Sequence, residues 1–142
     1  MHSFYTSEVE IETVVQGFES CKTGKSEFKH RDHLTVAVWY LSATNTERAT
    51  GSMRAGLLRF LDHHGVGREK YNETLTVFWM DLVSQTLREI EPGSSLVEKC
   101  NHVLESLQDP ALTFEYYSKE LLWSDDARKG WVEPDLKAWK QF

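Results

Sequence analysis

Three histidines in this chain are spaced so that together they could hold a metal ion. His30 and His33 lie three residues apart ahead of an apolar run, so on a helix both face the same side. His64 closes a later segment and could supply a third nitrogen. Imidazoles are good ligands for zinc, iron or nickel, each of which can act as a Lewis acid. We therefore predict His30, His33 and His64 as candidate ligands of a divalent metal.

Glu73 is the acid that we expect to work beside these histidines. Burial raises the pKa of a glutamate, so Glu73 could act as a general base, or it could join the histidines as a metal ligand. The side chains expected to contact a ligand nearby are Tyr71, Asn72, Tyr117 and Arg128. Arg128 could hold an acidic substrate through paired hydrogen bonds. The hypothesis is a buried His/Glu pocket for a small molecule or a divalent metal, which could serve a metal-dependent enzyme.

Each of these segments also has a purely structural interpretation. Asp32 can cap a helix, and a histidine before Gly65 can interact with the last carbonyls of one. Asn72 is a typical helix cap with Glu73 as an acid in the first turn. Aromatic residues around Tyr117 normally build core. The competing hypothesis is a non-catalytic interaction module that could form a homodimer. In that case the histidines are helix caps and the aromatic residues form an interface.

The acidic composition excludes several partners. The 142 residues carry a formal net charge of -6, which disfavours a phosphate backbone, so we expect no nucleic-acid partner. No apolar stretch approaches the roughly 20 residues of a membrane span, and the first residues lack the pattern of a secretion signal. We therefore expect a cytoplasmic protein with no membrane partner. Cys21 and Cys100 lie outside any Cys-x-x-Cys spacing, which predicts reduced thiols.

Helices must position these side chains, because apolar residues recur at helical spacing along most of the chain. We predict long helices over about 10–21, 31–43, 46–63, 72–90 and 95–107. Thr46 is the predicted cap of the third, and Ser95 with Glu98 forms a predicted capping box for the fifth. Shorter helices should begin at Asp109–Pro110 and after Ser124. The β-branched run Thr35–Val38 is also compatible with a strand, but the apolar spacing beyond it favours a helix.

The predicted fold class is all-α, with residues 1–142 as a single helical domain. Hydrophobic residues make up 40% of the chain, which is enough for one sizeable core. Short connections favour a bundle of five or six helices packed mostly against their sequence neighbours. Residues 1–9 and 132–142 should be extended tails, the second held to the body by Trp131 and Trp139.

Taken together, the motifs resemble those of a family of small bacterial proteins with no established activity. The shared elements are His30 to Leu34, His64-Gly65, Tyr71-Asn72-Glu73-Thr74, Tyr116-Tyr117-Ser118, Ser124 to Arg128 and Val132 to Asp135. The resemblance spans Phe28 to Leu136 and implies that the first three segments form one site. The family pattern has histidine where this chain has Asn72. Asparagine can coordinate a hard cation but cannot exchange a proton, so this departure implies weaker metal binding or none.

Overall fold

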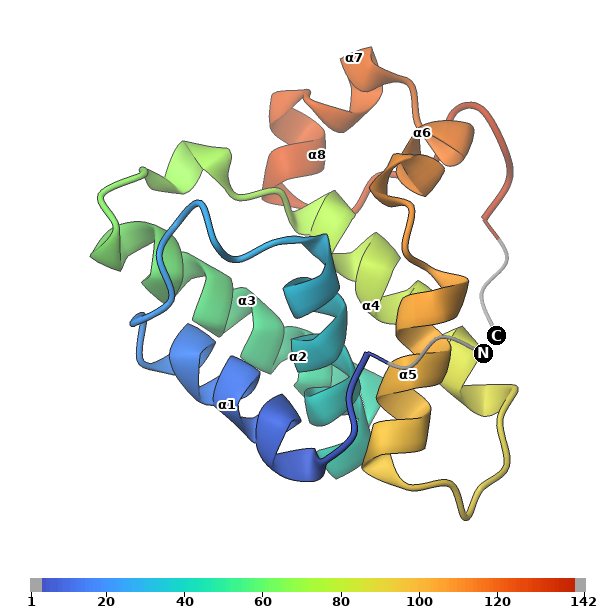
Figure 1. Ribbon diagram of the computed structural model, residues 1–142. Coiled ribbons are helices and arrows are strands. Elements are labelled where there is room, and N and C mark those ends of the chain that lie inside the picture. The colour runs from blue at the N-terminus through green and yellow to red at the C-terminus, as the bar shows by residue number, and fades with distance from the viewer. Residues whose placement is uncertain (1–3, 140–142) are drawn as a thin grey trace.

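The computed structural model describes residues 4–139, and this part of the chain is helical without strands (Figure 1). The five long helices are α1 (Glu8–Glu19), α2 (His30–Ala43), α3 (Thr46–His63), α4 (Glu73–Arg88) and α5 (Leu96–Ser106). Shorter elements are the 3-10 helices η1 (Arg68–Lys70) and η2 (Pro110–Leu112), with α6 (Thr113–Tyr116), α7 (Lys119–Leu122) and α8 (Asp125–Lys129). The all-α fold class is confirmed, although the C-terminal part is divided into more short helices than predicted. None of the helices described is long and apolar enough to span a membrane.

α2 is the central helix, and it packs against α1, α3, α4 and α5 (Figure 1). Five consecutive residues, from Leu34 to Val38, are buried. Because one helical turn takes 3.6 residues, such a run shows that α2 is covered on every side. The β-branched residues, which were also compatible with a strand, are therefore part of a core helix. The most extensive contact of α2 is with α5, so the predicted preference for sequence neighbours does not hold for this helix.

Several predicted helix ends are confirmed by hydrogen bonds. The carboxylate of Asp32 accepts the Lys29 N–H at the start of α2. Ser95 and Glu98 form the expected capping box of α5. The end of α3 is also as predicted, because Gly65 follows it with a φ of 66°, a left-handed conformation that glycine adopts easily.

Two predicted ends differ from the structure. α3 is capped by Asn45, whose side chain accepts the Arg48 N–H, and not by Thr46. The Thr46 hydroxyl instead shares a hydrogen bond with Ser84 of α4. α1 begins at Glu8, so the N-terminal tail is shorter than the predicted 1–9. The predicted tail ends at 1–3 and 140–142 lie outside the described residues.

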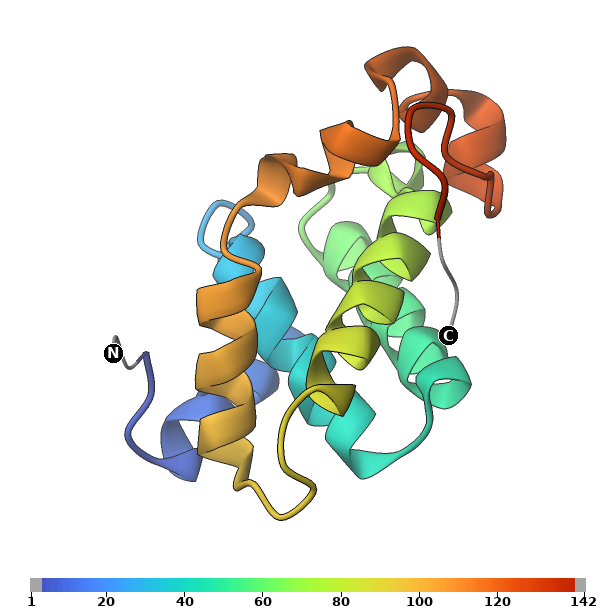
Figure 2. The same ribbon diagram turned by 90° about the vertical axis from the view of Figure 1, so that its right-hand side faces the viewer.

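The C-terminal segment covers one end of the bundle. Figure 2 shows α6, α7 and α8 at the end where α5 stops and α4 starts. Trp131 and Trp139 pack with Phe78 of α4 and Tyr117 in a second hydrophobic cluster. The expectation that both tryptophans hold the tail to the body is confirmed. Residues 132–139 contain no helix, as predicted for a tail.

Candidate functional site

A cavity of about 570 Å³ lies between α2, α3 and α4, beneath the short helices α6 and α7. Most of its lining is apolar, and the buried apolar residues in it are Leu34, Ala37, Met53, Phe60, Met80, Val83 and Leu122. Lys25, Lys70 and Trp123 also line it but are exposed, so they mark its opening to solvent. A concave apolar site of this size with a few polar groups is typical of small-molecule binding.

His30 and His33 both line this cavity, as their spacing on one helix predicts. His30 packs edge-on against Trp79, and its Nε2 donates to the carbonyl oxygen of Leu107 at 2.8 Å. That bond places a hydrogen on Nε2, so neutral His30 has its lone pair on Nδ1.

His33 is a neutral group in the cavity wall. Its ring lies 4.3 Å from that of Phe28, centroid to centroid. Burial, aided by the nearby His30, lowers the pKa of His33 to about 4. Neither ring nitrogen has a hydrogen-bond partner among the described residues, and neither is sealed from the cavity. His33 can therefore donate to or accept from a ligand at neutral pH.

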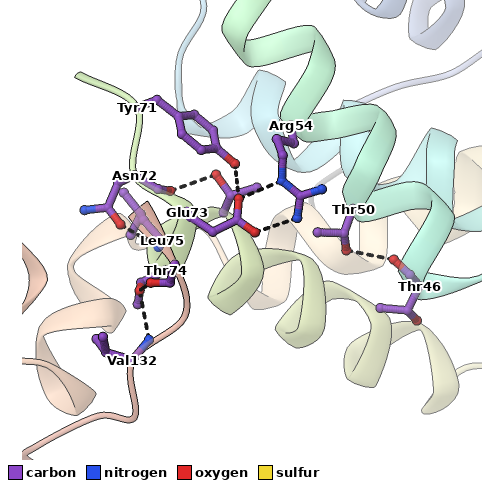
Figure 3. Close-up of polar contacts among 11 residues, drawn as sticks. Thr46, Thr50, Arg54, Tyr71, Asn72, Glu73, Thr74, Leu75 and Val132 are labelled. Carbon is purple, nitrogen blue, oxygen red and sulfur yellow. Dashed lines mark hydrogen bonds and ion pairs between the residues drawn. The ribbon is translucent and has the colours of Figure 1, made fainter. Parts of the chain in front are cut away.

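Glu73 lies apart from the histidines and is not part of the cavity lining. Arg54 of α3 binds both of its carboxylate oxygens, with Nε 2.8 Å from Oε1, and Tyr71 donates to Oε1 at 2.6 Å (Figure 3). Burial by itself would raise the pKa of Glu73, but these hydrogen bonds and the Arg54 charge outweigh it and lower the pKa. The predicted rise in the pKa of Glu73 is therefore wrong, while its role as a general base stays a prediction. The ionised carboxylate joins α3 to the start of α4 through Arg54.

The three histidines do not meet at one point. His64 directly follows α3, and its ring packs against Phe60 outside the cavity lining. Its Nε2 is buried without a hydrogen-bond partner in residues 4–139. No three His, Cys, Asp or Glu side chains in that range are arranged to hold a metal ion. The structure thus brings His30 and His33 together, but it does not add His64 or Glu73 to them.

Tyr71 and Asn72 line the cavity, yet their polar atoms already have partners. The Asn72 side-chain oxygen accepts the Leu75 N–H, which confirms the helix-cap interpretation. Its Nδ2 donates to the carbonyl oxygen of Leu122 at 2.7 Å, which ties the start of α4 to the end of α7. The Tyr71 hydroxyl is held by Glu73. These two residues therefore shape the cavity wall. The Thr113 hydroxyl, by contrast, is buried in the lining without a hydrogen-bond partner among residues 4–139.

The link between Asn72 and Leu122 makes the first testable prediction. In Asn72→Asp the helix cap remains, but the donor is replaced by an oxygen facing a buried carbonyl. We expect the free energy of unfolding to fall by about 1–3 kcal/mol, measured by urea denaturation. Asn45→Asp is the matched control, because Asn45 is an exposed cap whose oxygen alone is used. Equal effects of the two substitutions would show that the Leu122 contact contributes nothing.

Tyr117 and Arg128 lie outside the cavity lining. The Tyr117 hydroxyl donates to the Val132 carbonyl at 2.6 Å and fixes the chain after α8. Arg128 pairs with Asp125 of its own helix at 2.8 Å. Both side chains thus contact the C-terminal segment, and their expected ligand contacts stay predictions. The interpretation of the aromatic residues around Tyr117 as core is confirmed.

Sequence reasoning missed most of the cavity wall. Helical spacing places Trp79 and Phe60 only on apolar helix faces, and it assigns no ligand contact to Lys25 or Lys70. Apolar spacing identifies the inner face of each helix, but it does not show where three inner faces leave a space between them. Both lysines lie in connections between long helices, Lys25 in the loop before α2 and Lys70 in η1 between α3 and α4. Ligand-contacting residues are common in such connections, and this is the one signal that could have identified them.

Comparisons with known proteins add no relative. No protein-family model matches the chain, and neither the curated proteins nor the solved structures contain a match. The resemblance to a bacterial family therefore stays a prediction.

Proposed function

We propose that this protein binds a small, largely apolar organic molecule in the cavity between α2, α3 and α4. The observation that supports the proposal is the cavity itself, about 570 Å³ and mostly apolar in its lining. Burying apolar ligand surface there gains roughly 25 cal/mol for each Å² removed from water. His33, with two free ring nitrogens, and His30, with one, could orient a polar group of the ligand.

This proposal replaces the metal scheme with direct ligand binding. The Glu73 carboxylate binds Arg54 and Tyr71 and lies outside the cavity lining, so it is not placed to transfer a proton to a ligand in the cavity. The interaction-module alternative has less support from the surface. Among residues 4–139 the large exposed hydrophobics are Val9 on α1, Trp123 directly after α7, and Leu136 in the segment after α8. Scattered apolar residues of this kind are normal on a protein surface.

The test is titration with a neutral apolar fluorophore, N-phenyl-1-naphthylamine, followed through its own emission and through the quenching of tryptophan emission, to which Trp79 in the lining contributes. We expect saturable binding of one molecule and a higher melting temperature in its presence. Ala37→Phe fills the cavity from α2 and should weaken binding at least tenfold. Ala43→Phe is the matched control, because Ala43 is exposed at the end of the same helix.

Leu57→Trp blocks the cavity from α3 and guards against misfolding of the first variant. Both blocking variants should keep the helical circular-dichroism spectrum of wild type. Binding that is absent in wild type, or equal in wild type and both folded blocking variants, would overturn the proposal.

A further inference from the structure

The sign of charge around the cavity is opposite to that of the chain as a whole. The sequence has 22 acidic and 16 basic residues, yet the lining contains Lys25 and Lys70 and no aspartate or glutamate. The other titratable nitrogen groups in the lining are His30 and His33. A cavity that concentrates positive charge within an acidic protein favours an anionic group at that place.

Both lysines are available to such a group. Lys25 lies in the loop before α2 and Lys70 in η1, and neither forms an ion pair within residues 4–139. Their acidic neighbours are turned to other contacts. Glu27 accepts the Gly24 N–H, and the Glu69 carboxylate occupies the space where a side chain at position 67 would lie. The positive charge at the opening is thus not neutralised by a partner of its own.

The interior, by contrast, is largely apolar and contains no side chain with a formal charge. Besides the two histidine rings, its polar groups include the Thr113 hydroxyl, which is buried without a hydrogen-bond partner in residues 4–139. The deep lining residues Met53, Met80 and Val83 are apolar. The hydroxyl of Thr76 in the wall already donates to the carbonyl oxygen of Asn72. Burying a charge in such a place without a partner is costly, so a charged group must stay near the opening. One end of the cavity therefore suits an anion and the other an apolar body.

We infer that the ligand is an apolar carboxylic acid, with its carboxylate at Lys25 and Lys70 and its hydrocarbon part between α2, α3 and α4. This inference rests on the proposed function and names its ligand class. The lining has no arginine that could bind a phosphate through paired hydrogen bonds, so the head group that we propose is a carboxylate. His33 faces the same space and can hydrogen-bond the acid group or its neighbouring atoms.

The experiment compares three ligands that share a ten-carbon chain: decanoate, decanol and decyl phosphate. We expect decanoate to bind on the order of tenfold more tightly than decanol at low salt, with the difference shrinking at high salt. Decyl phosphate should bind no better than decanoate. Calorimetry at pH 7 below the micelle concentrations measures all three.

The double variant Lys25→Gln/Lys70→Gln should lose the preference for decanoate and keep wild-type affinity for decanol. Lys22→Gln/Lys129→Gln is the matched control, since both lysines are exposed and outside the lining. Equal binding of decanoate and decanol, or a preference that survives the double variant, overturns the inference while the proposed cavity function stands. Failure of the neutral fluorophore as well as all three ligands overturns both.

Discussion

Replacing Phe60 with alanine is expected to lower the free energy of unfolding by about 3–5 kcal/mol. The Phe60 side chain is 5% exposed, and its ring lies 5.8 Å from that of Phe18 and 5.3 Å from that of Phe28. It is both part of the main core and a wall of the cavity. Removing it therefore enlarges the cavity toward the core. Few neighbouring side chains can move into the added space, because they already border the cavity.

Urea denaturation of Phe60→Ala and Phe60→Leu measures this effect. The leucine variant keeps most of the apolar volume and should lose less than the alanine variant. Val9→Ala serves as the control, because Val9 is 67% exposed and its truncation should change stability little. A loss below about 1 kcal/mol in Phe60→Ala would mean that this wall is not packed as the structure describes.

The parts of the fold that could be predicted are those set by residues close in the sequence. Apolar spacing and the Ser95–Glu98 box located helices, because a helix and its cap depend on neighbours within one or two turns. The cap of α3, predicted at Thr46 and found at Asn45, could not be predicted in this way. Both residue types can cap a helix, and the outcome depends on Ser84, which occupies the Thr46 hydroxyl from another helix.

In the candidate site, too, contacts within one helix could be predicted and contacts between helices could not. His30 and His33 share the cavity because three residues on one helix bring side chains to one face. The partner of Glu73 was unpredictable, since it depends on how α3 and α4 are aligned along each other, and this alignment brought Arg54 to it. A buried acid was expected to have a raised pKa, but one cation beside it reversed the direction.

Arg54→Met is the change that tests this reversal. At pH 7 the variant leaves the Glu73 carboxylate, whose side chain is 15% exposed, with Tyr71 as its remaining side-chain donor. Hydrogen bonds to a charged group contribute about 1.5–3 kcal/mol, and the 42% exposure of the Arg54 side chain reduces this through solvent screening. We expect a loss of about 1–2 kcal/mol in the free energy of unfolding.

The pH dependence identifies Glu73 as the source of that loss. Its pKa in the folded protein lies below the ordinary value of 4.5, so the folded state favours the ionised form. This contribution is complete above pH 4.5 and disappears as the pH falls through the folded pKa. The difference between wild type and Arg54→Met should therefore be largest near neutrality and shrink below pH 4.5, in denaturation curves measured from pH 7 to pH 3.

Two further variants decide whether the carboxylate and the guanidinium act on each other. If they do, Glu73→Gln combined with Arg54→Met should cost less than the sum of the two single changes, as residues in direct contact are not additive. Arg68→Met breaks the exposed pair with Asp62 and should have a much smaller effect. A pH-independent loss in Arg54→Met would mean that the arginine contributes through its packing on α4 and not through the charge of Glu73.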